Sequence, residues 1–363
     1  MIKPVDLLFT LLRFSLNVEE NNINTSTSAF AEATNDDWQR VFKLSVEQGV
    51  LLLCYGGWQC LPANLQPFCK LKLRWCANVV KANERYERYK TVIDKLSVLF
   101  LENNIKLLII KGITLSELYP TPYYREVGDI DVFVAGNTTK ANKLLSRVGM
   151  RHEEEIPKHT TFNLGGIAVE NHYTLFDTTL PFGKERQLYV QMEKLLRNML
   201  ADCTCLTVYS NSVFQLPPQV AALHFIGHTF RHFCCMDMNI RQLCDWTIFF
   251  TTYRKEIDSN LLSMQINELG LAKFVCHINA VCSGYLGFEP YFMLPAKTDK
   301  QAEHFILKTI MRYKVNPSIP VWSVLCNLFY RNRIYKKYLG KVTFPEFLYP
   351  EIKSYLVSKL KPQ

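Results

Sequence analysis

Two aspartates lie two residues apart in an apolar run near the middle of the chain. Asp129 and Asp131 belong to the sequence Asp-Ile-Asp-Val-Phe-Val. Side chains at positions i and i+2 of a β-strand point to the same face, so we expect the two carboxylates to project side by side. Neighbouring carboxylates in apolar surroundings are costly unless positive charge lies between them. The pattern therefore predicts a site for a divalent cation, Mg²⁺ or Mn²⁺.

A Lys-Gly turn precedes the aspartates. The apolar run 107–110 reads as a buried strand, and Lys111-Gly112 follows it just before a short expected helix. A glycine there lets backbone N–H groups approach phosphate oxygens, and the start of a helix favours an anion. Lys111 and Arg125 would add charged donors, and Thr114 would add a hydroxyl. The segment is thus a candidate phosphate-binding turn.

Glu170 is the candidate third carboxylate of the site. It lies in the second strand of an expected β-hairpin whose two strands meet at Gly165-Gly166. Phosphoryl or nucleotidyl transfer needs a divalent metal and donors that position phosphates, and little other chemistry from the protein. An Asp-x-Asp pair alone is also compatible with an incidental role. Together with the turn and Glu170, it indicates a catalytic and metal-binding set of Asp129, Asp131 and Glu170.

Four histidines are further candidates. His172, two residues after Glu170, could orient a carboxylate, contact substrate or serve only the structure. His224, His228 and His232 recur at i, i+4 and i+8, on one face of an expected helix. Zinc binding, packing and substrate contact all stay open for them, although no acid or cysteine arrangement completes a zinc site. His172, His224 and His228 are the candidate substrate contacts.

Two further charge patterns lie in the C-terminal part. Arg241 and Asp245 are spaced i, i+4, which predicts a helix ion pair that anchors these helices to the central region. The basic stretch 331–341 could bind nucleic acid or an anionic membrane surface, or form an ordinary basic helix face. The aromatic stretch 344–350 is expected to pack on the body of the protein.

Helical periodicity surrounds a strand-rich centre, which predicts an α+β fold: a mixed β-sheet core with helices, flanked by helical regions. The expected divisions are an N-terminal helical region 1–103, an α/β core 104–215 and a C-terminal helical region 216–363. The expected helices span 6–16, 36–55, 67–103, 114–119, 137–148, 187–200, 220–233 and 239–253, and the expected strands 105–110, 129–135, 160–164 and 167–173.

Several boundaries and burials can be predicted within this scheme. The polar segment 19–28 is expected to form a loop. Gly56-Gly57 is expected to end the helix 36–55. Gly284 is expected to mark a later break. Leu73 and Val80 belong to the apolar stripe of the long helix.

Composition describes a globular protein, with 48% hydrophobic and 21% charged residues over 363 positions. The net charge of +9 suits a polyanion such as a nucleoside triphosphate or nucleic acid, but does not require one. The 12 cysteines show no zinc-ligand spacing. We see no secretory signal and no apolar run of the ~18 residues that span a bilayer, so we expect a cytoplasmic protein.

The central run resembles a known family. It reads Ile110-Lys111-Gly112, then Leu118-Tyr119-Pro120-Thr121-Pro122, Arg125 and Gly128-Asp129-Ile130-Asp131-Val132-Phe133-Val134. This is similar to the uncharacterised nucleotidyltransferase family of the DNA polymerase β-like superfamily, most clearly over 105–175. Glu170-Asn171-His172 resembles that family's later Glu-x-His strand, and Leu223-His224-Phe225 to His228 with Arg241 to Asp245 its helical features. Gly112 is followed by Ile113, where the wider superfamily has serine or glycine.

The resemblance implies a metal-dependent enzyme that moves a nucleoside monophosphate from a nucleoside triphosphate to an unknown acceptor hydroxyl. The alternative is a catalytically silent regulatory protein of the same fold that binds a nucleotide or nucleic acid. A structural protein with vestigial carboxylates is a third hypothesis, against which the intact acids argue. A fold shared with a superfamily does not by itself fix activity or substrate.

Overall fold

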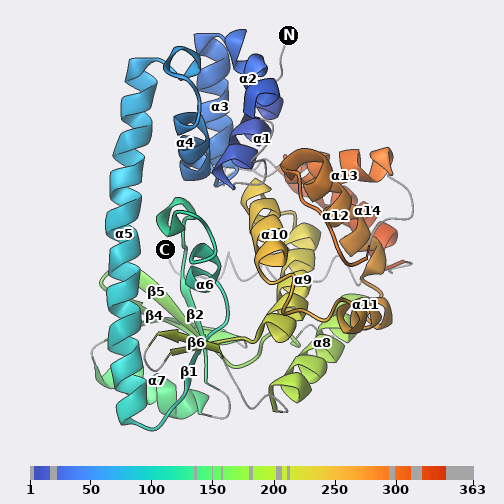
Figure 1. Cartoon of the computed structure of the whole chain (residues 1–363). Coiled ribbons are helices and arrows are strands. Elements are labelled where there is room, and N and C mark those ends of the chain that lie inside the picture. The colour runs from blue at the N-terminus through green and yellow to red at the C-terminus, as the bar shows by residue number, and fades with distance from the viewer. Residues whose placement is uncertain are drawn as a thin grey trace.

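The computed structural model describes residues 4–16, 23–134, 137–148, 150–156, 158–179, 183–201, 207–210, 213–293, 299–311 and 321–340. It shows helices around one mixed sheet, which confirms the predicted α+β class. Figure 1 shows the N-terminal helices at the top, the sheet at the lower left and the C-terminal helices on the right.

Five helices form the N-terminal region. They are α1 Pro4–Ser15, α2 Ile23–Ala31, α3 Asn35–Glu47, α4 Leu51–Gln59 and α5 Cys69–Glu102. The expected loop 19–28 is wrong from Ile23 onward, because α2 begins there. The expected helix 36–55 is also wrong, since Gly49 adopts a φ of +65° and separates α3 from α4.

Gly56 and Gly57 lie inside α4 and do not end it. A Cβ built on Gly57 would lie 2.0 Å from the carbonyl oxygen of Leu11 in α1. The glycine therefore serves the close approach of two helices. Glycine has a low helix propensity, so the sequence predicts a helix end at Gly56-Gly57. In the structure, the close packing of α1 on α4 explains Gly57 instead.

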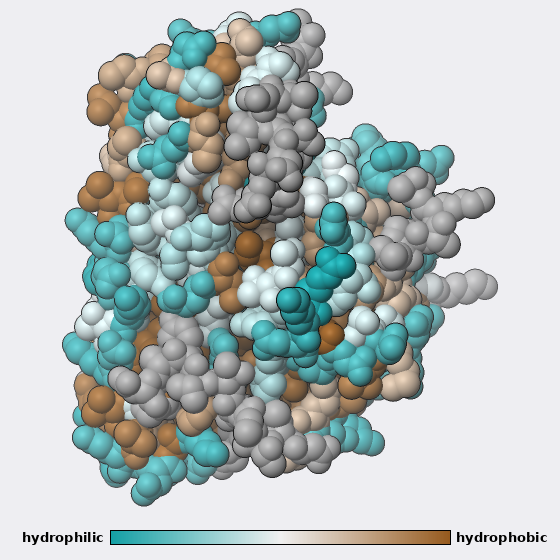
Figure 2. Space-filling view, viewed as in Figure 1, coloured by the Kyte–Doolittle hydropathy of each residue, from teal (hydrophilic) through white to brown (hydrophobic). Residues whose placement is uncertain are grey.

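The long helix α5 connects the N-terminal helices to the sheet (Figure 1). Its 34 residues extend about 51 Å at 1.5 Å per residue. Leu71 and Trp75 bury their side chains against the N-terminal helices. Leu73 and Val80 point away, with 65% and 59% exposure, so their predicted burial is wrong. Figure 2 shows apolar residues along this edge of the molecule.

Seven strands form the sheet in the order β3-β4-β5-β2-β1-β7-β6. They are β1 Leu107–Ile109, β2 Ile130–Phe133, β3 Arg151–Glu155, β4 His159–Leu164, β5 Ile167–His172, β6 Thr207–Ser210 and β7 Val213–Gln215. The predicted hairpin is confirmed as β4 and β5, which pair antiparallel. Strand β2 pairs parallel with β5 and antiparallel with β1. The sequence did not predict β3, β6 and β7.

Alternation along the central strands separates two cores. Ile130 and Val132 of β2 belong to the core under α5 and α7, whereas Phe133 belongs to the core shared with the N- and C-terminal helices. Asp131 lies between Ile130 and Val132, so its side chain points to the same face as Phe133. The sheet thereby directs Asp131 away from α5 and toward the helices on the other side.

Nine further α-helices lie in the described residues. They are α6 Ile113–Ser116, α7 Thr138–Arg147, α8 Lys184–Ala201, α9 Pro218–Cys235, α10 Ile240–Thr252, α11 Ser259–Glu268, α12 Ala272–Leu286, α13 Lys300–Ile310 and α14 Val321–Tyr338. The break expected at Gly284 is wrong, because α12 continues to Gly287, which has a φ of +71°. Stretch 331–340 belongs mainly to α14, whereas 344–350 lies outside the described residues.

One hydrophobic core joins the N-terminal and C-terminal helices. It contains buried residues of α1, α3 and α4 together with those of α9, α10 and α12, and α1 also contacts α12 directly. The three predicted divisions stay a prediction. In the described part of the chain, no helix has both the length and the apolar character that crossing a bilayer requires.

Gly57→Ala tests the contact of α1 with α4. We expect a loss of about 3 kcal/mol in the free energy of unfolding, because the new methyl group overlaps a backbone oxygen that cannot rotate away. Urea denaturation measures the change. Gly284→Ala in α12 is the matched control, since the nearest atom to its Cβ lies 3.9 Å away. Equal stability of the two variants would contradict the packing described for Gly57.

Candidate active site

The three predicted carboxylates converge at one end of the central strands. Asp131 in β2 lies directly beside Glu170 in β5, because the parallel strands pair in that register. Asp129 lies one residue before β2. One oxygen of each carboxylate lies within 4.8 Å of the others. Acids that are far apart in sequence thus form one cluster.

Asp131 is fully buried and its two oxygens differ. Oδ1 lies 3.1 Å from Nζ of Lys111 and 2.8 Å from Nε2 of His172. Oδ2 has no hydrogen-bond partner among the described residues. Burial raises the pKa of Asp131, but Lys111 and His172 outweigh it and hold this pKa well below the usual range. Asp131 is therefore ionised, with one oxygen left without a partner.

Asp129 behaves differently from its neighbour. The charge of Asp131 and then burial raise the pKa of Asp129 to about 6, although Lys111 opposes the shift. A like charge held close makes the second ionisation harder. Asp129 is the carboxyl of the cluster that gains a proton first as the pH falls.

Two histidines lie beside Glu170. Nδ1 of His159 and Nε2 of His172 lie 3.2 Å and 3.3 Å from Oε2 of Glu170. Burial raises the pKa of Glu170, but the hydrogen bond from His172 and the neighbouring positive charges bring it below the usual value. His159 was missed in the sequence. Its signal is that it lies opposite His172 in the β4–β5 hairpin.

The Lys111-Gly112 turn packs against the backbone that carries Asp129. Gly112 has a φ of +80°, and a Cβ there would lie 3.2 Å from the carbonyl oxygen of Asp129. Only glycine combines this conformation with such a close approach. Burial alone would lower the pKa of Lys111, but Asp131, Asp129 and Glu170 raise it above its ordinary value, so its ammonium stays charged.

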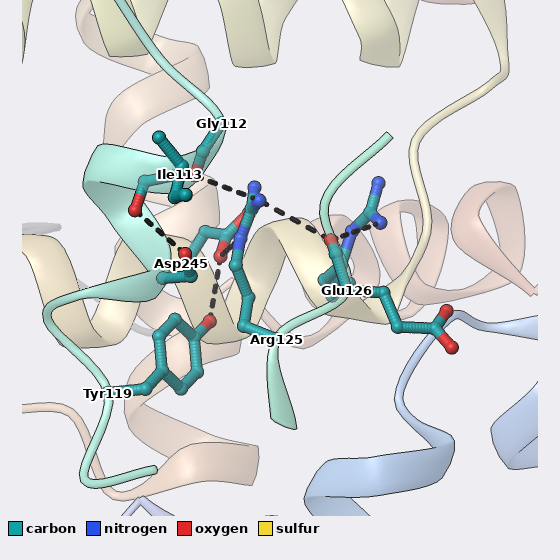
Figure 3. Close-up of polar contacts among 8 residues, drawn as sticks. Gly112, Ile113, Tyr119, Arg125, Glu126 and Asp245 are labelled. Atoms are coloured by element: carbon teal, nitrogen blue, oxygen red, sulfur yellow. Dashed lines mark hydrogen bonds and ion pairs between the residues drawn. The ribbon is translucent and has the colours of Figure 1, made fainter. Parts of the chain in front are cut away.

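Arg125 binds Asp245 of α10 through a buried bidentate ion pair (Figure 3). Both nitrogen–oxygen distances are 2.9 Å. The hydroxyl of Tyr119 donates to the same carboxylate at 2.7 Å. Nη1 of Arg125 donates to the carbonyl oxygen of Gly112 at 3.1 Å. This network ties α10 to the turn beside the carboxylates.

The ion pair expected between Arg241 and Asp245 is therefore corrected. Asp245 pairs with Arg125, and Arg241 donates to the carbonyl oxygen of Glu126 at 3.2 Å instead. Helical spacing made the local pair plausible, but the guanidinium of Arg125 satisfies both oxygens of the carboxylate. The predicted attachment of the helix to the core does exist, through a residue 120 positions away.

A cavity of about 250 Å³ adjoins the cluster. Its lining combines polar and apolar side chains. The polar and glycine residues are Lys111, Gly112, Thr114, Arg125, Asp129, Asp131, His224 and His228, and the apolar and aromatic ones include Leu118, Leu216, Phe225, Phe249 and Tyr253. The cavity thus offers both charged groups and aromatic surface to a ligand.

The α9 histidines face this cavity. Burial lowers the pKa of His224 to about 3 and also lowers the pKa of His228, with help from nearby positive charges such as Lys111. Both are therefore neutral at physiological pH. Nε2 of His228 lies 2.9 Å from Nε2 of His232, whose Nδ1 lies 2.8 Å from Oδ1 of Asp237. A chain of hydrogen bonds leads from the cavity wall to a half-exposed acid.

Comparison with known proteins decides the family. The model of the family described as uncharacterised nucleotidyltransferase matches residues 34–287. The chain belongs to this family of nucleotidyltransferases. No curated protein and no solved structure gives a significant match. The match begins before α3 and ends at the end of α12, so this nucleotidyltransferase is a transferase whose family unit includes helices on both sides of the sheet.

The carboxylate cluster of this nucleotidyltransferase fits a divalent cation. Hard cations take oxygen ligands, and three carboxylates here offer oxygens within 4.8 Å of one another. The buried Oδ2 of Asp131 has no partner among the described residues, which is rare for a carboxylate without a ligand. His159, Glu170 and His172 form a second group of potential ligands that shares Glu170.

Asp245→Asn tests the attachment of α10. We expect a loss of about 3–5 kcal/mol in the free energy of unfolding, because Arg125 would remain buried without its counter-charge. Thermal or urea unfolding measures it. Asp36→Asn breaks an exposed ion pair with Arg40 and should cost less than about 1 kcal/mol. Similar losses of unfolding free energy in the two variants would show that the Arg125–Asp245 pair stabilises the fold no more than an exposed ion pair does.

Metal affinity should depend on pH through Asp129. Because Asp131 raises the pKa of Asp129 to about 6, a bound proton competes with a cation below that pH. Titration calorimetry with Mn²⁺ should show affinity that is constant above pH 7 and weakens as the pH falls through 6. Asp129→Asn should bind more weakly and lose this dependence. Unchanged wild-type affinity between pH 7.5 and 5 would contradict the assignment.

Proposed function

We propose that the protein transfers a nucleoside monophosphate from a nucleoside triphosphate to an acceptor hydroxyl, and that the reaction needs Mg²⁺ or Mn²⁺. The observation that supports this is the convergence of Asp129, Asp131 and Glu170 beside a cavity, with one buried oxygen of Asp131 left without a partner among the described residues. The family provides the general reaction class. The need for a metal, the nucleoside triphosphate donor and the acceptor hydroxyl are what we propose beyond this class.

The three carboxylates would bind the metal. They differ in how many protein groups keep each of them in place. When bound, the ion would neutralise phosphate charge and favour an ionised acceptor oxygen. Lys111 and His172 fix Asp131, and His172 also contacts Glu170, so these carboxylates need little reorganisation. Glu170 is ionised and can accept the proton that the acceptor hydroxyl releases.

The phosphates would bind on the β1 side of the cluster. Lys111, Thr114 and the backbone at Gly112 line the cavity there, and Lys111 keeps its charge. Arg125 lines the same wall, but Asp245 and the Gly112 carbonyl occupy three of its nitrogens. In our proposal it assists nucleotide binding mainly by fixing the turn.

The acceptor would approach from the α9 side. His172, His224 and His228 are the proposed contacts, and the two α9 histidines are neutral, so they can both donate and accept hydrogen bonds. The acceptor oxygen would form a bond to the α-phosphorus as the bond to the bridging oxygen breaks. Pyrophosphate leaves, and the acceptor proton passes to Glu170.

Transfer of label from α-³²P nucleoside triphosphates tests the proposal. The wild-type protein is incubated with each triphosphate, Mg²⁺ or Mn²⁺ and cell extract as the source of acceptor. Asp131→Asn should lower the rate of labelling at least about 100-fold, because it removes charge from the best-held carboxylate. Asp36→Asn, on the exposed face of α3, is the control and should label at the wild-type rate.

Two results would count against parts of the proposal. Tight triphosphate binding by the wild-type protein without any transfer would favour the silent binding protein. Transfer that is equally fast in Asp131→Asn would show that the carboxylate cluster is not the reacting site.

A further inference from the structure

A row of three histidines in α9 leads from the cavity to the protein surface. His224, His228 and His232 all line the cavity. Nε2 of His228 lies 2.9 Å from Nε2 of His232, and Nδ1 of His232 lies 2.8 Å from Oδ1 of Asp237, whose side chain is half exposed. His228 is a proposed contact of the acceptor substrate. The groups behind it therefore decide which of its atoms that substrate meets.

The end of α9 positions Asp237. Met236 adopts a left-handed conformation with a φ of +60°, and the backbone N–H of Asp237 donates to the carbonyl oxygen of His232 at 3.1 Å. Glycine is the usual residue at such a helix end, because a side chain is strained in this conformation. Asn239 then caps the start of α10. The backbone is thus fixed on both sides of Asp237, and its carboxylate is held beside His232.

The carboxylate of Asp237 determines which nitrogen of His232 carries the proton. An ionised carboxylate only accepts hydrogen bonds, so Nδ1 of His232 must donate to it. In neutral His232 the other nitrogen, Nε2, then has no proton and accepts a hydrogen bond. The atom beside it is Nε2 of His228, which must be the donor. Two hydrogen bonds thus fix the tautomers of both rings.

Nδ1 of His228 is left with a lone pair. Burial and then the charge of Lys111 lower the pKa of His228, so its ring is neutral at physiological pH. A neutral imidazole has one donor and one acceptor nitrogen, and Nε2 is the donor here. Nδ1 has no hydrogen-bond partner among the described residues and is not one of the fully buried polar atoms. Because His228 lines the cavity, this lone pair is available to a ligand.

His224 is a second sign that a polar ligand binds at these histidines. Its side chain is 3% exposed and lines the cavity, yet neither ring nitrogen has a hydrogen-bond partner in the described part of the chain. Its ring is stacked on that of His228, with 6.0 Å between the ring centres. Buried polar side chains nearly always have a partner. A ligand in the cavity would supply the missing one.

We propose that Asp237 and His232 are positioning residues that hold His228 as a hydrogen-bond acceptor, and that the acceptor substrate binds there through an O–H or N–H group. A phosphate or carboxylate oxygen would set its own lone pairs against that of Nδ1. This inference rests on the proposed function, because it defines one group of the unknown acceptor. A neutral, hydroxyl-bearing molecule fits this part of the cavity, while the phosphates of the triphosphate bind beside Lys111.

A simpler role for Asp237 is to stabilise the end of α9. His232 lies in the last turn of the helix, where a polar or positive group is favourable. If the pair served only the helix, loss of Asp237 would lower the melting temperature and leave the proton of His228 on Nε2. If the pair positions His228, loss of Asp237 will change where that proton resides.

NMR of the ¹⁵N-labelled histidine side chains tests the tautomers in the full-length protein. At about pH 8.5, above the ordinary titration range of histidine, wild-type His228 should carry its proton on Nε2 and none on Nδ1. In Asp237→Ala the hydrogen bond between the two histidines can run in either direction, so a large fraction of His228 should be protonated on Nδ1. Asp237→Glu should restore the wild-type tautomer. Glu268→Ala, at an exposed position of α11, is the control.

Labelling from α-³²P nucleoside triphosphates connects the tautomer with the acceptor. Asp237→Ala and His232→Phe should raise the amount of cell extract needed for half-maximal labelling about 10-fold, because acceptor binding loses a hydrogen bond. The triphosphate concentration needed should stay the same, since the phosphates bind elsewhere. Asp237→Glu should recover the wild-type requirement for extract, and Glu268→Ala should not change it.

Acetate tests the class of the bound group, because a carboxylate can only accept hydrogen bonds. We expect the proton of His228 to stay on Nε2 in the presence of acetate. Movement of this proton to Nδ1 would show that an anion binds there and that the proposed class of acceptor is wrong.

Two results would overturn the positioning role. One is a proton on Nδ1 of His228 in the wild-type protein. The other is an Asp237→Ala variant that melts at a lower temperature but keeps the wild-type tautomer and the wild-type requirement for extract.

The proposed function fails separately. A protein whose His228 tautomer changes in Asp237→Ala, but which transfers no label as the wild type, would keep the positioning role and lose the reaction. A protein that transfers label with the same requirement for extract in both forms would keep the reaction and lose the inference.

Discussion

The parallel pairing of β2 with β5 is the constraint on which the site depends. It places Asp131 beside Glu170 on one face, while the alternate residue Asn171 turns to the other face and hydrogen-bonds Asn142 of α7 at 2.7 Å. A shift of one residue in this register would exchange the two faces. It would bury Glu170 against α7 and leave Asp131 without its neighbour. The apolar residues that alternate with the acids fix the register, so the core and the site specify each other.

Helical parts of the chain support the site through few but buried contacts. Asp245 of α10 holds Arg125, and Arg125 holds the carbonyl of Gly112, whose turn packs on the backbone of Asp129. On the other side, the hydroxyl of Tyr89 in α5 donates to the carbonyl of Gly128 at 2.8 Å. The backbone before β2 is therefore fixed from two helices. A family unit that includes both helical regions agrees with this dependence.

Local sequence patterns predicted the central strands and the candidate carboxylates. Features that depend on long-range packing could not be predicted from the sequence. The Asp-x-Asp strand, the Gly-Gly hairpin and Glu170 have clear signals of period and turn type. The partner of Asp245 could not be found from the sequence, because a local arginine at i−4 was the obvious choice and the real one lies 120 positions away. The same limit applies to β3, β6 and β7, which are short and acquire their pairing only in the sheet.

Glycines show the same distinction. Gly112 and the hairpin glycines lie in turns, as their sequence context predicts, whereas Gly57 and Gly284 lie inside helices. At Gly57 the reason is a neighbouring helix backbone, and no local pattern contains that information. The residue type indicates conformational freedom or small size, and the sequence alone does not say which of the two is used.

The three carboxylates differ in how firmly they are held, and this difference suits a site that must load and release its ligands. Two donors fix Asp131, and His172 also contacts Glu170. Asp129 lies outside the strand, and no donor contacts its carboxylate in the described part of the chain. The charge of Asp131 and then burial raise the pKa of Asp129, and Lys111 opposes this shift only in part. A cation would relieve that repulsion, so the closeness of the two aspartates favours cation binding.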